Sequence, residues 1–175
     1  MERNKMFKHL HIFDDYGAIG KKYIEDFEKQ YNICLPKTYK EFILKHNGGS
    51  FYESHFDFIN KSGQEDMRCF LFKSFGEPER GKELITDTNL HLQDPNYYGV
   101  KGLIGFASTA EGDTVCFDYR DDPKTCEPKI ALLVHDEYET DPDGYEHMKV
   151  EYIANSFDEF LDMLYEFNDD DIEYE

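Results

Sequence analysis

The chain has 175 residues, of which 38 are acidic and 19 are Lys or Arg, giving a formal net charge of -19. This length indicates one domain, and 39% hydrophobic residues with 15 Phe and 13 Tyr supply enough apolar mass for a core, which excludes global disorder. The acidic excess excludes nucleic acid and anionic membranes as partners and favours basic ones, unless it serves solubility alone.

Two amphipathic helices are expected near the N-terminus. The stretch KKYIEDFEKQYNI places apolar residues at i, i+3 and i+7, which is one face of a helix. Pro36 suits the first turn of a second helix, because its missing N–H costs nothing there. Asn47, Gly48 and Gly49 are expected to end that helix, because one of them can take the left-handed conformation after its last turn. The expected buried stripes are Ile24, Phe27 and Tyr31 in the first helix, and Tyr39, Phe42, Ile43 and His46 in the second.

Several strands are expected in the middle of the chain. SFYESHFDFIN indicates one or two strands and MRCFLFKSF another, with a short helix near residues 82–89 in the turn-rich stretch that follows. Within Thr114–Tyr119, alternation places Val115 and Phe117 on one face and Cys116 on the other. The remaining expected strands are Leu103–Ala107, Lys129–Val134 and Lys149–Ile153, of which the last two are joined by an acidic loop.

A C-terminal helix is expected to begin at Ser156, because Glu159 three residues later completes a capping box. The layout predicts an α+β fold in a single domain, residues 1–175, with a core of about 19–167. A mainly antiparallel sheet of about five or six strands carries the two N-terminal helices and the C-terminal helix. Residues 168–175 are expected to form a frayed acidic tail. The helix's apolar face is Phe157, Phe160, Leu161, Leu164 and Phe167.

Three blocks of the sequence resemble the SUKH superfamily, the group that includes fungal cell-wall synthesis regulators of the Smi/Knr type. They are LPKTYKEFILKHNGG, IGFASTAEGDTVCFDYR and VEYIANSFDEFLDML, in the family's order. The resemblance implies one α+β domain. For the bacterial branch it implies an immunity protein that binds a toxin delivered between competing cells, often a nuclease. Fungal members look like regulatory or scaffold proteins instead.

The family's marked residues have a structural interpretation in this chain. We expect them to define the fold rather than to contact a partner, by setting helix entry, packing and turns. The stretch from about Glu77 to Lys101 and the acidic loop before Met148 have no clear counterpart in the family pattern. The fold-defining positions are Leu35, Pro36, Tyr39, Phe42, Gly48, Gly49, Gly105, Gly112 and Asp113.

The segment from His135 to His147 is the candidate contact surface, since it holds six acids, two tyrosines and no Lys or Arg. Carboxylates can pair with the Arg and Lys of a toxin and can imitate phosphate in a basic nuclease groove, while tyrosines supply interface anchors. The alternative is a solvated hairpin loop with Asp143 and Gly144 as turn residues. The candidate residues are Asp136, Glu137, Tyr138, Glu139, Asp141, Asp143 and Tyr145, with Asp169, Asp170 and Asp171 as a second candidate.

No catalytic residue, cofactor or metal site is expected. ETDPDG fits the first half of an EF-hand calcium loop, but the twelfth position is Val150 instead of Glu, so weak cation binding is the most that it supports. His9 and His11 alternate without further ligands at metal-site spacing. The chain has no GxSxG motif and no phosphate-binding glycine loop. A hydrolase that uses some carboxylate pair is a third alternative, which a pocket with perturbed acids would favour.

The cysteines bear on the compartment. None of the four is in a CxxC motif, and without a recognisable signal peptide we expect reduced, buried thiols rather than disulfides. No apolar run approaches the ~20 residues that span a bilayer. The sequence therefore predicts a non-enzymatic cytoplasmic protein, a monomer or weak dimer, that binds and neutralises a cognate basic toxin. The alternative is a regulatory or scaffold module of the fungal type. The cysteines are Cys34, Cys69, Cys116 and Cys126.

Overall fold

The computed structural model describes residues 9–79 and 81–168. Six strands form an antiparallel sheet in the order β3-β4-β5-β6-β7-β8, so that each strand pairs with the next along the chain. A two-stranded sheet pairs β1 (Ile12–Asp14) with β2 (Ser50–Phe51). The predicted α+β fold with a sheet of five or six antiparallel strands is thereby confirmed. The large sheet consists of β3 His55–Ile59, β4 Glu65–Phe72, β5 Leu103–Thr109, β6 Thr114–Asp118, β7 Lys129–Thr140 and β8 Glu146–Ala154.

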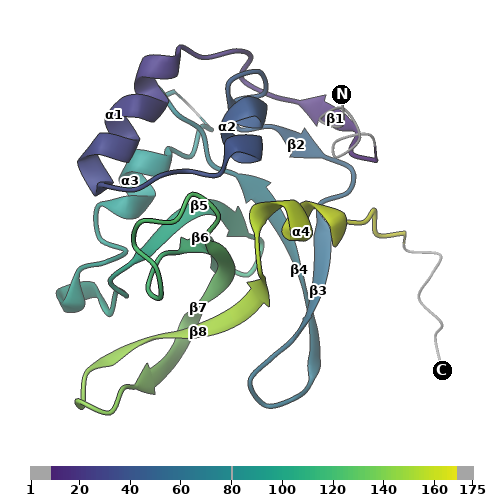
Figure 1. Cartoon of the computed structure of the whole chain (residues 1–175). Coiled ribbons are helices and arrows are strands. Elements are labelled where there is room, and N and C mark those ends of the chain that lie inside the picture. Colours follow the sequence, from purple (N-terminus) through teal and green to yellow (C-terminus); the bar gives the residue numbers. More distant parts are fainter. Residues whose placement is uncertain (1–8, 80, 169–175) are drawn as a thin grey trace.

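Three helices cover the inner face of this sheet: α1 (Lys21–Tyr31), α2 (Lys37–Ile43) and α4 (Phe157–Asp162). Figure 1 shows them gathered on one side of the curled sheet. Tyr39 of α2 lies at the centre of this core, fully buried, with the rings of three phenylalanines within 6 Å of its own. The helix stripes read from the sequence therefore face the sheet, as the 3.6-residue period requires.

Two details of the helices differ from expectation. His46 lies beyond the end of α2, half-buried, and its Nδ1 is 2.8 Å from Asp15 Oδ2. The last helix ends at Asp162, after which Tyr165 forms a one-residue antiparallel bridge with His55 of β3. Its start is as predicted, because Ser156 Oγ accepts the Glu159 N–H at 3.1 Å. The helix is therefore shorter than the predicted apolar face, which ran to Phe167, because Tyr165 pairs with the sheet instead.

The segment between β4 and β5 (residues 73–79 and 81–102), which we call the outer-face segment, covers part of the outer face of the sheet with Leu92 and Val100, while its Ile85 packs into the inner core. It holds α3 (Ile85–Asn89) and a 3-10 turn, η1 (Pro95–Tyr97). The side-chain amide of Asn89 pairs with the β5 backbone as a neighbouring strand would. Its Oδ1 accepts the Gly105 N–H at 2.9 Å, and its Nδ2 donates to the Gly105 carbonyl oxygen at 2.8 Å. A Cβ on Gly105 would lie 3.0 Å from Thr88 Cγ2, so glycine permits this close packing. The second core comprises Leu92, Val100, Leu103, Cys116, Ala131, Leu133 and Val150.

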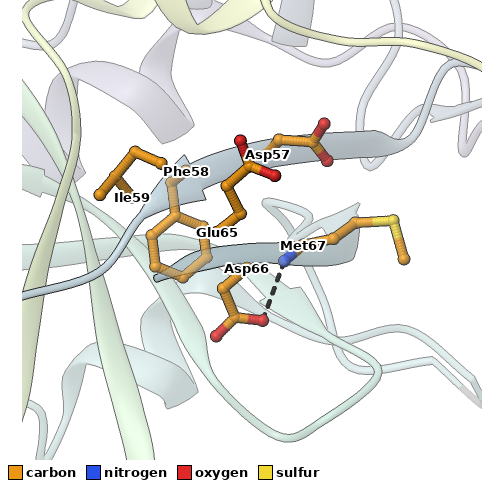
Figure 2. Close-up of a pocket in the computed structure, with 6 residues that line it drawn as sticks. All are labelled: Asp57, Phe58, Ile59, Glu65, Asp66 and Met67. Carbon is orange, nitrogen blue, oxygen red and sulfur yellow. Dashed lines mark hydrogen bonds between the residues drawn. The ribbon is translucent and has the colours of Figure 1, made fainter. Parts of the chain in front are cut away.

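The hairpin of β3 and β4 presents an open outer face. Figure 2 shows Asp57, Ile59, Glu65 and Met67 on one side of the hairpin, with Phe58 and Asp66 directed to the other. The hairpin also approaches β8, because the Glu151 carboxylate accepts the Lys61 N–H at 2.9 Å. The tip of the first edge strand's hairpin therefore lies against the other edge strand of the sheet.

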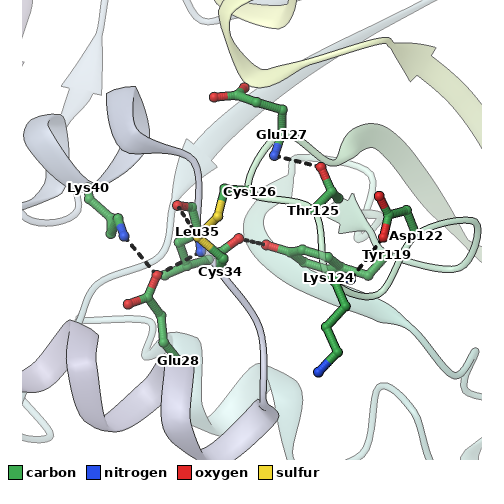
Figure 3. The surroundings of a disulfide bond; sticks show 10 residues. All are labelled: Glu28, Cys34, Leu35, Lys40, Tyr119, Asp122, Lys124, Thr125, Cys126 and Glu127. Atoms are coloured by element: carbon green, nitrogen blue, oxygen red, sulfur yellow. Dashed lines mark hydrogen bonds and ion pairs between the residues drawn. A yellow bond between two sulfur atoms is a disulfide. The ribbon is translucent and has the colours of Figure 1, made fainter.

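A disulfide joins Cys34 to Cys126, 92 residues apart in the sequence, so the prediction of reduced thiols is wrong for this pair. Figure 3 shows that the bond links the loop between α1 and α2 to the loop between β6 and β7. Cys69 and Cys116 are free. The two bonded cysteines meet only because those loops dock, and spacing along the chain carries no sign of it.

Candidate protein-binding surface

The acidic segment is mostly strand, so the prediction of a long loop is wrong. β7 runs to Thr140 and β8 begins at Glu146, and register pairs such as Glu139↔His147 continue to the tip. Only the turn itself remains: Asp141 Oδ1 accepts the N–H groups of Asp143 and Tyr145, each at 3.0 Å. The segment is therefore an ordered two-stranded ribbon that projects away from the helices (Figure 1).

A bulge interrupts the ribbon where it leaves the sheet. The pairs Val134↔Lys149 and Tyr138↔Met148 are consecutive on β8, so three residues of β7 have no partner opposite them. The middle one, Asp136, adopts φ 61°, in the left-handed region that Asp tolerates better than most residues. Bulges of this kind redirect side chains. This one exposes His135, Asp136 and Glu137.

Asp113 fixes the base of the bulge. Its Oδ1 accepts the His135 N–H at 2.7 Å, and its Oδ2 accepts Arg68 Nε at 2.7 Å. The Asp113 side chain is 3% exposed and the Arg68 side chain 13%. A Cβ on Gly112, where φ is 91°, would lie 3.3 Å from the His135 ring. Gly112 and Asp113, which we expected only to shape a turn, therefore also support the ribbon.

The carboxylates of the ribbon divide into two groups. Glu139 pairs with Lys61 and accepts the Val150 N–H at 3.1 Å. Burial alone would raise the pKa of Glu139, but the Lys61 and Val150 hydrogen bonds outweigh it and lower that pKa. Asp141 holds the turn. The other three carboxylates are exposed. Asp136 lies 3.2 Å from His135, and Glu137 lies 3.0 Å from Lys149. Asp143 is at the tip of the ribbon.

The tyrosines of the segment also have separate roles. Tyr145 donates its hydroxyl to Gly99 O at 2.6 Å and so ties the turn to the outer-face segment. Tyr138 is exposed, and its ring packs edge-on against Tyr98 at 5.0 Å. Sequence reasoning missed Tyr97 and Tyr98, both exposed, although an aromatic pair in a polar stretch is a usable signal. We call Asp136, Glu137, Tyr138, Asp143, Tyr97 and Tyr98 the acidic ribbon surface.

Other predicted positions lie elsewhere. Leu35 and Phe42 are buried with Tyr39 in the inner core, and Pro36 precedes α2 as its N-cap residue. A Cβ on Gly49 would lie 2.7 Å from Phe42 Cζ. Gly48 has φ 62° where α2 has ended. Asp169, Asp170 and Asp171 lie outside the described residues.

The histidines and acids do not assemble into a metal centre. His9 Nε2 lies 2.9 Å from Leu161 O, while His11 Nδ1 pairs with Glu53. Within residues 9–79 and 81–168, no three His, Cys, Asp or Glu side chains are placed to hold a metal ion. In the same ranges, no helix has the length and apolar character needed to cross a membrane.

Comparison with known protein families gives a match over most of the chain. The model of a family described as SMI1 / KNR4 family (SUKH-1) matches residues 18–163, which include both N-terminal helices, the whole six-stranded sheet and α4. The matched range also contains the outer-face segment and the acidic ribbon surface. No curated protein matches the chain.

Proposed function

Because the chain belongs to the SMI1/KNR4 family (SUKH-1), we propose that it is an immunity-type protein of the cytoplasm that binds and neutralises a cognate toxin. The partner is basic and nuclease-like, and the complex is stoichiometric, with this chain a monomer or weak dimer when free. Catalysis has no part in this function. The bound protein acts by blocking the toxin's active site or the path of its substrate.

The acidic ribbon surface is the observation that supports this proposal. Its exposed carboxylates stand beside exposed tyrosine rings on a projecting ribbon. Aromatic residues are the commonest anchors of interfaces, and carboxylates pair with the Arg and Lys that a nuclease uses to hold phosphate. Since Asp113 and the Lys61–Glu139 pair already hold the ribbon in place, binding would require little further ordering.

Charge determines how fast such a partner arrives. The first 50 residues carry a net charge of +2, so the remaining 125 carry -21, six of whose acids lie between His135 and His147. A field of this asymmetry orients and accelerates the approach of a cationic protein, and salt screens it. The carboxylates therefore govern the association rate, whereas Tyr138 and Tyr98 govern how long the complex lasts.

The test is a charge-neutral triple variant, Asp136→Asn, Glu137→Gln and Asp143→Asn, which spares the structural carboxylates. We expect its association rate constant with a toxin domain encoded at the same locus to fall about three- to tenfold at low salt, with a flatter salt dependence. Tyr138→Ala should instead raise the dissociation rate about tenfold. Stopped-flow fluorescence measures both constants, and survival on co-expression with the toxin measures protection.

The matched control removes an equal number of negative charges outside the acidic ribbon surface. Its substitutions, all at exposed positions, are Glu25→Gln, Glu77→Gln and Glu79→Gln. If both triple variants slow association equally, the net charge matters and the acidic ribbon surface does not. If no toxin domain from the locus binds and pull-down recovers signalling or cell-wall proteins, the regulatory module of the fungal type replaces this proposal.

A further inference from the structure

A second surface, made of residues other than those of the acidic ribbon surface, lies on the outer face of the β3–β4 hairpin. Three large apolar side chains are exposed there: Ile59 at 59%, Met67 at 38% and Leu71 at 53%. On the neighbouring strands the same face is buried under Leu92 and Val100 of the outer-face segment. The register pair Leu71↔Ser108 marks the boundary between the covered and the open part.

The pattern on this face alternates acids with apolar residues. Cross-strand pairs place Asp57 opposite Met67 and Ile59 opposite Glu65. These four residues line a shallow hollow of about 520 Å³ together with Phe58 and Asp66, whose side chains point to the other side of the hairpin (Figure 2). An open face of an antiparallel sheet is normally polar. Exposed aliphatic side chains framed by carboxylates are instead what an interaction surface presents.

The unpaired charges that the hairpin exposes to solvent are carboxylates. Its two cations are already engaged: Lys61 by Glu139 of β7, and Arg68 by Asp66 and Asp113. Glu65 is exposed, and its carboxylate has no bonding partner among the described residues. Asp57 is exposed, and within residues 9–79 and 81–168 its carboxylate accepts a single hydrogen bond, from the Tyr165 hydroxyl at 2.7 Å. A second copy of the chain would therefore bring carboxylate against carboxylate, which is unfavourable.

We infer that this face is a docking surface for an apolar protein segment flanked by Lys or Arg, such as an amphipathic basic helix. Ile59, Met67 and Leu71 would contact its apolar stripe, and Asp57 and Glu65 its cations. The β3 backbone is held by pairing with β4 and by the His55–Tyr165 bridge, so the face is formed before the partner arrives. The inference goes beyond the proposed function, since it holds for any basic partner.

The probe is a short synthetic peptide whose leucines form one helical stripe bordered by lysines, compared with a scramble of identical composition. We expect the patterned peptide to bind the full chain at least about tenfold more tightly than the scramble, as measured by calorimetry. Methyl NMR signals of Ile59, Met67 and Leu71 should shift on titration. The double variant Ile59→Ser and Leu71→Ser should weaken binding about tenfold or more.

Matched variants separate this surface from others. Leu90→Ser removes an apolar side chain that is 61% exposed outside this face and should bind the peptide as the unaltered chain does. The ribbon triple variant should also retain binding, so failure here and failure of the proposed function are distinguishable. Equal binding of the two peptides, or methyl shifts confined to the ribbon, would overturn the inference. So would a dimer in sedimentation that Ile59→Ser and Leu71→Ser abolishes, because the occupant would then be a second copy.

Discussion

Asp113 shows how much one buried side chain can organise. Its carboxylate receives Arg68 from β4 and the backbone N–H of His135 from β7, and its own N–H donates to Thr109 Oγ1 at 3.1 Å. Asp113 is the most buried of the carboxylates around Arg68, so its removal leaves the half-buried guanidinium with only the more exposed carboxylates of Asp66 and Glu111, which is costly. The residue therefore couples the turn between β5 and β6 to the bulge that carries the exposed acids.

We predict that Asp113→Ala lowers the free energy of unfolding by about 3–5 kcal/mol, as measured by urea denaturation. Asp66→Ala removes another carboxylate from the same guanidinium, but Asp66 is 38% exposed, so its loss should cost about 1 kcal/mol or less. Hydrogen exchange at the His135 amide should accelerate in the first variant only. Equal losses for the two variants would show that Asp113 is no more than a surface partner of Arg68.

The Asp15–His46 pair gives the fold a specific response to acid. The His46 hydrogen bond, and after it the Gly17 N–H at 2.6 Å, lower the pKa of Asp15, with burial opposing them. Because the folded-state pKa lies below the unfolded value of about 3.9, the unfolded chain takes up its proton first as pH falls. The stabilisation is therefore complete above about pH 5 and is lost as pH falls through 3.9 to the folded-state pKa.

We predict that the stability difference between the unaltered chain and Asp15→Asn is largest at neutral pH and shrinks towards pH 3. Urea unfolding of both proteins at several pH values measures it. Other carboxylates titrate in both proteins and cancel in the comparison. A difference that stays constant over that range would mean that the carboxylate of Asp15 is not what the pairing stabilises.

At the scale of elements, the disulfide and the hydrogen bonds around it hold the same junction. The Tyr119 hydroxyl donates to Cys34 O at 2.7 Å, and Glu28 Oε1 accepts both the Leu35 N–H and Lys40 Nζ (Figure 3). These bonds do not involve sulfur. We therefore expect the loop between α1 and α2 to stay docked when the disulfide is reduced.

We predict that Cys34→Ser with Cys126→Ser lowers the free energy of unfolding by about 2–4 kcal/mol and leaves the circular dichroism spectrum native. The closed loop is long, which favours a sizeable effect, while the remaining hydrogen bonds preserve the fold. Dithiothreitol should lower the unfolding midpoint of the unaltered chain to that of the double variant and leave the variant unchanged. If dithiothreitol left the unfolding midpoint of the unaltered chain unchanged, the disulfide would not form in solution.

At the scale of the whole molecule, the sheet directs recognition to side chains instead of backbone. The turn of the β3–β4 hairpin contacts β8 through Lys61 and Glu151, and the edge of β3 carries the one-residue bridge to Tyr165, so the edges of the sheet are partly occupied. The helices of the nearly neutral N-terminal part cover the inner face, and the acidic ribbon projects from the opposite end (Figure 1). The exposed carboxylates of the ribbon therefore lie at the end of the molecule away from the nearly neutral N-terminal helices.

Periodicity and capping signals alone determined most of the elements. The stripe of α2, the start of α4 at Ser156 and the alternation in β6 follow from local rules, because helical period, strand period and an N-cap hydrogen bond involve residues close in sequence. The family resemblance rested on the same local blocks. The candidate residues Asp136, Glu137 and Tyr138 were identified by composition, which needs no knowledge of neighbours.

Only the tertiary structure decided what those residues contact. The bond between Cys34 and Cys126, the support of His135 by Asp113 and the pairing of Tyr98 with Tyr138 each join residues far apart in sequence. The acidic segment became strand because pairing with β8 extends beyond the sheet, which local polarity could not indicate. Interactions across such distances depend on how elements dock, and docking depends on the whole core at once. This is why the sequence located the charge and the fold determined which carboxylates remain exposed.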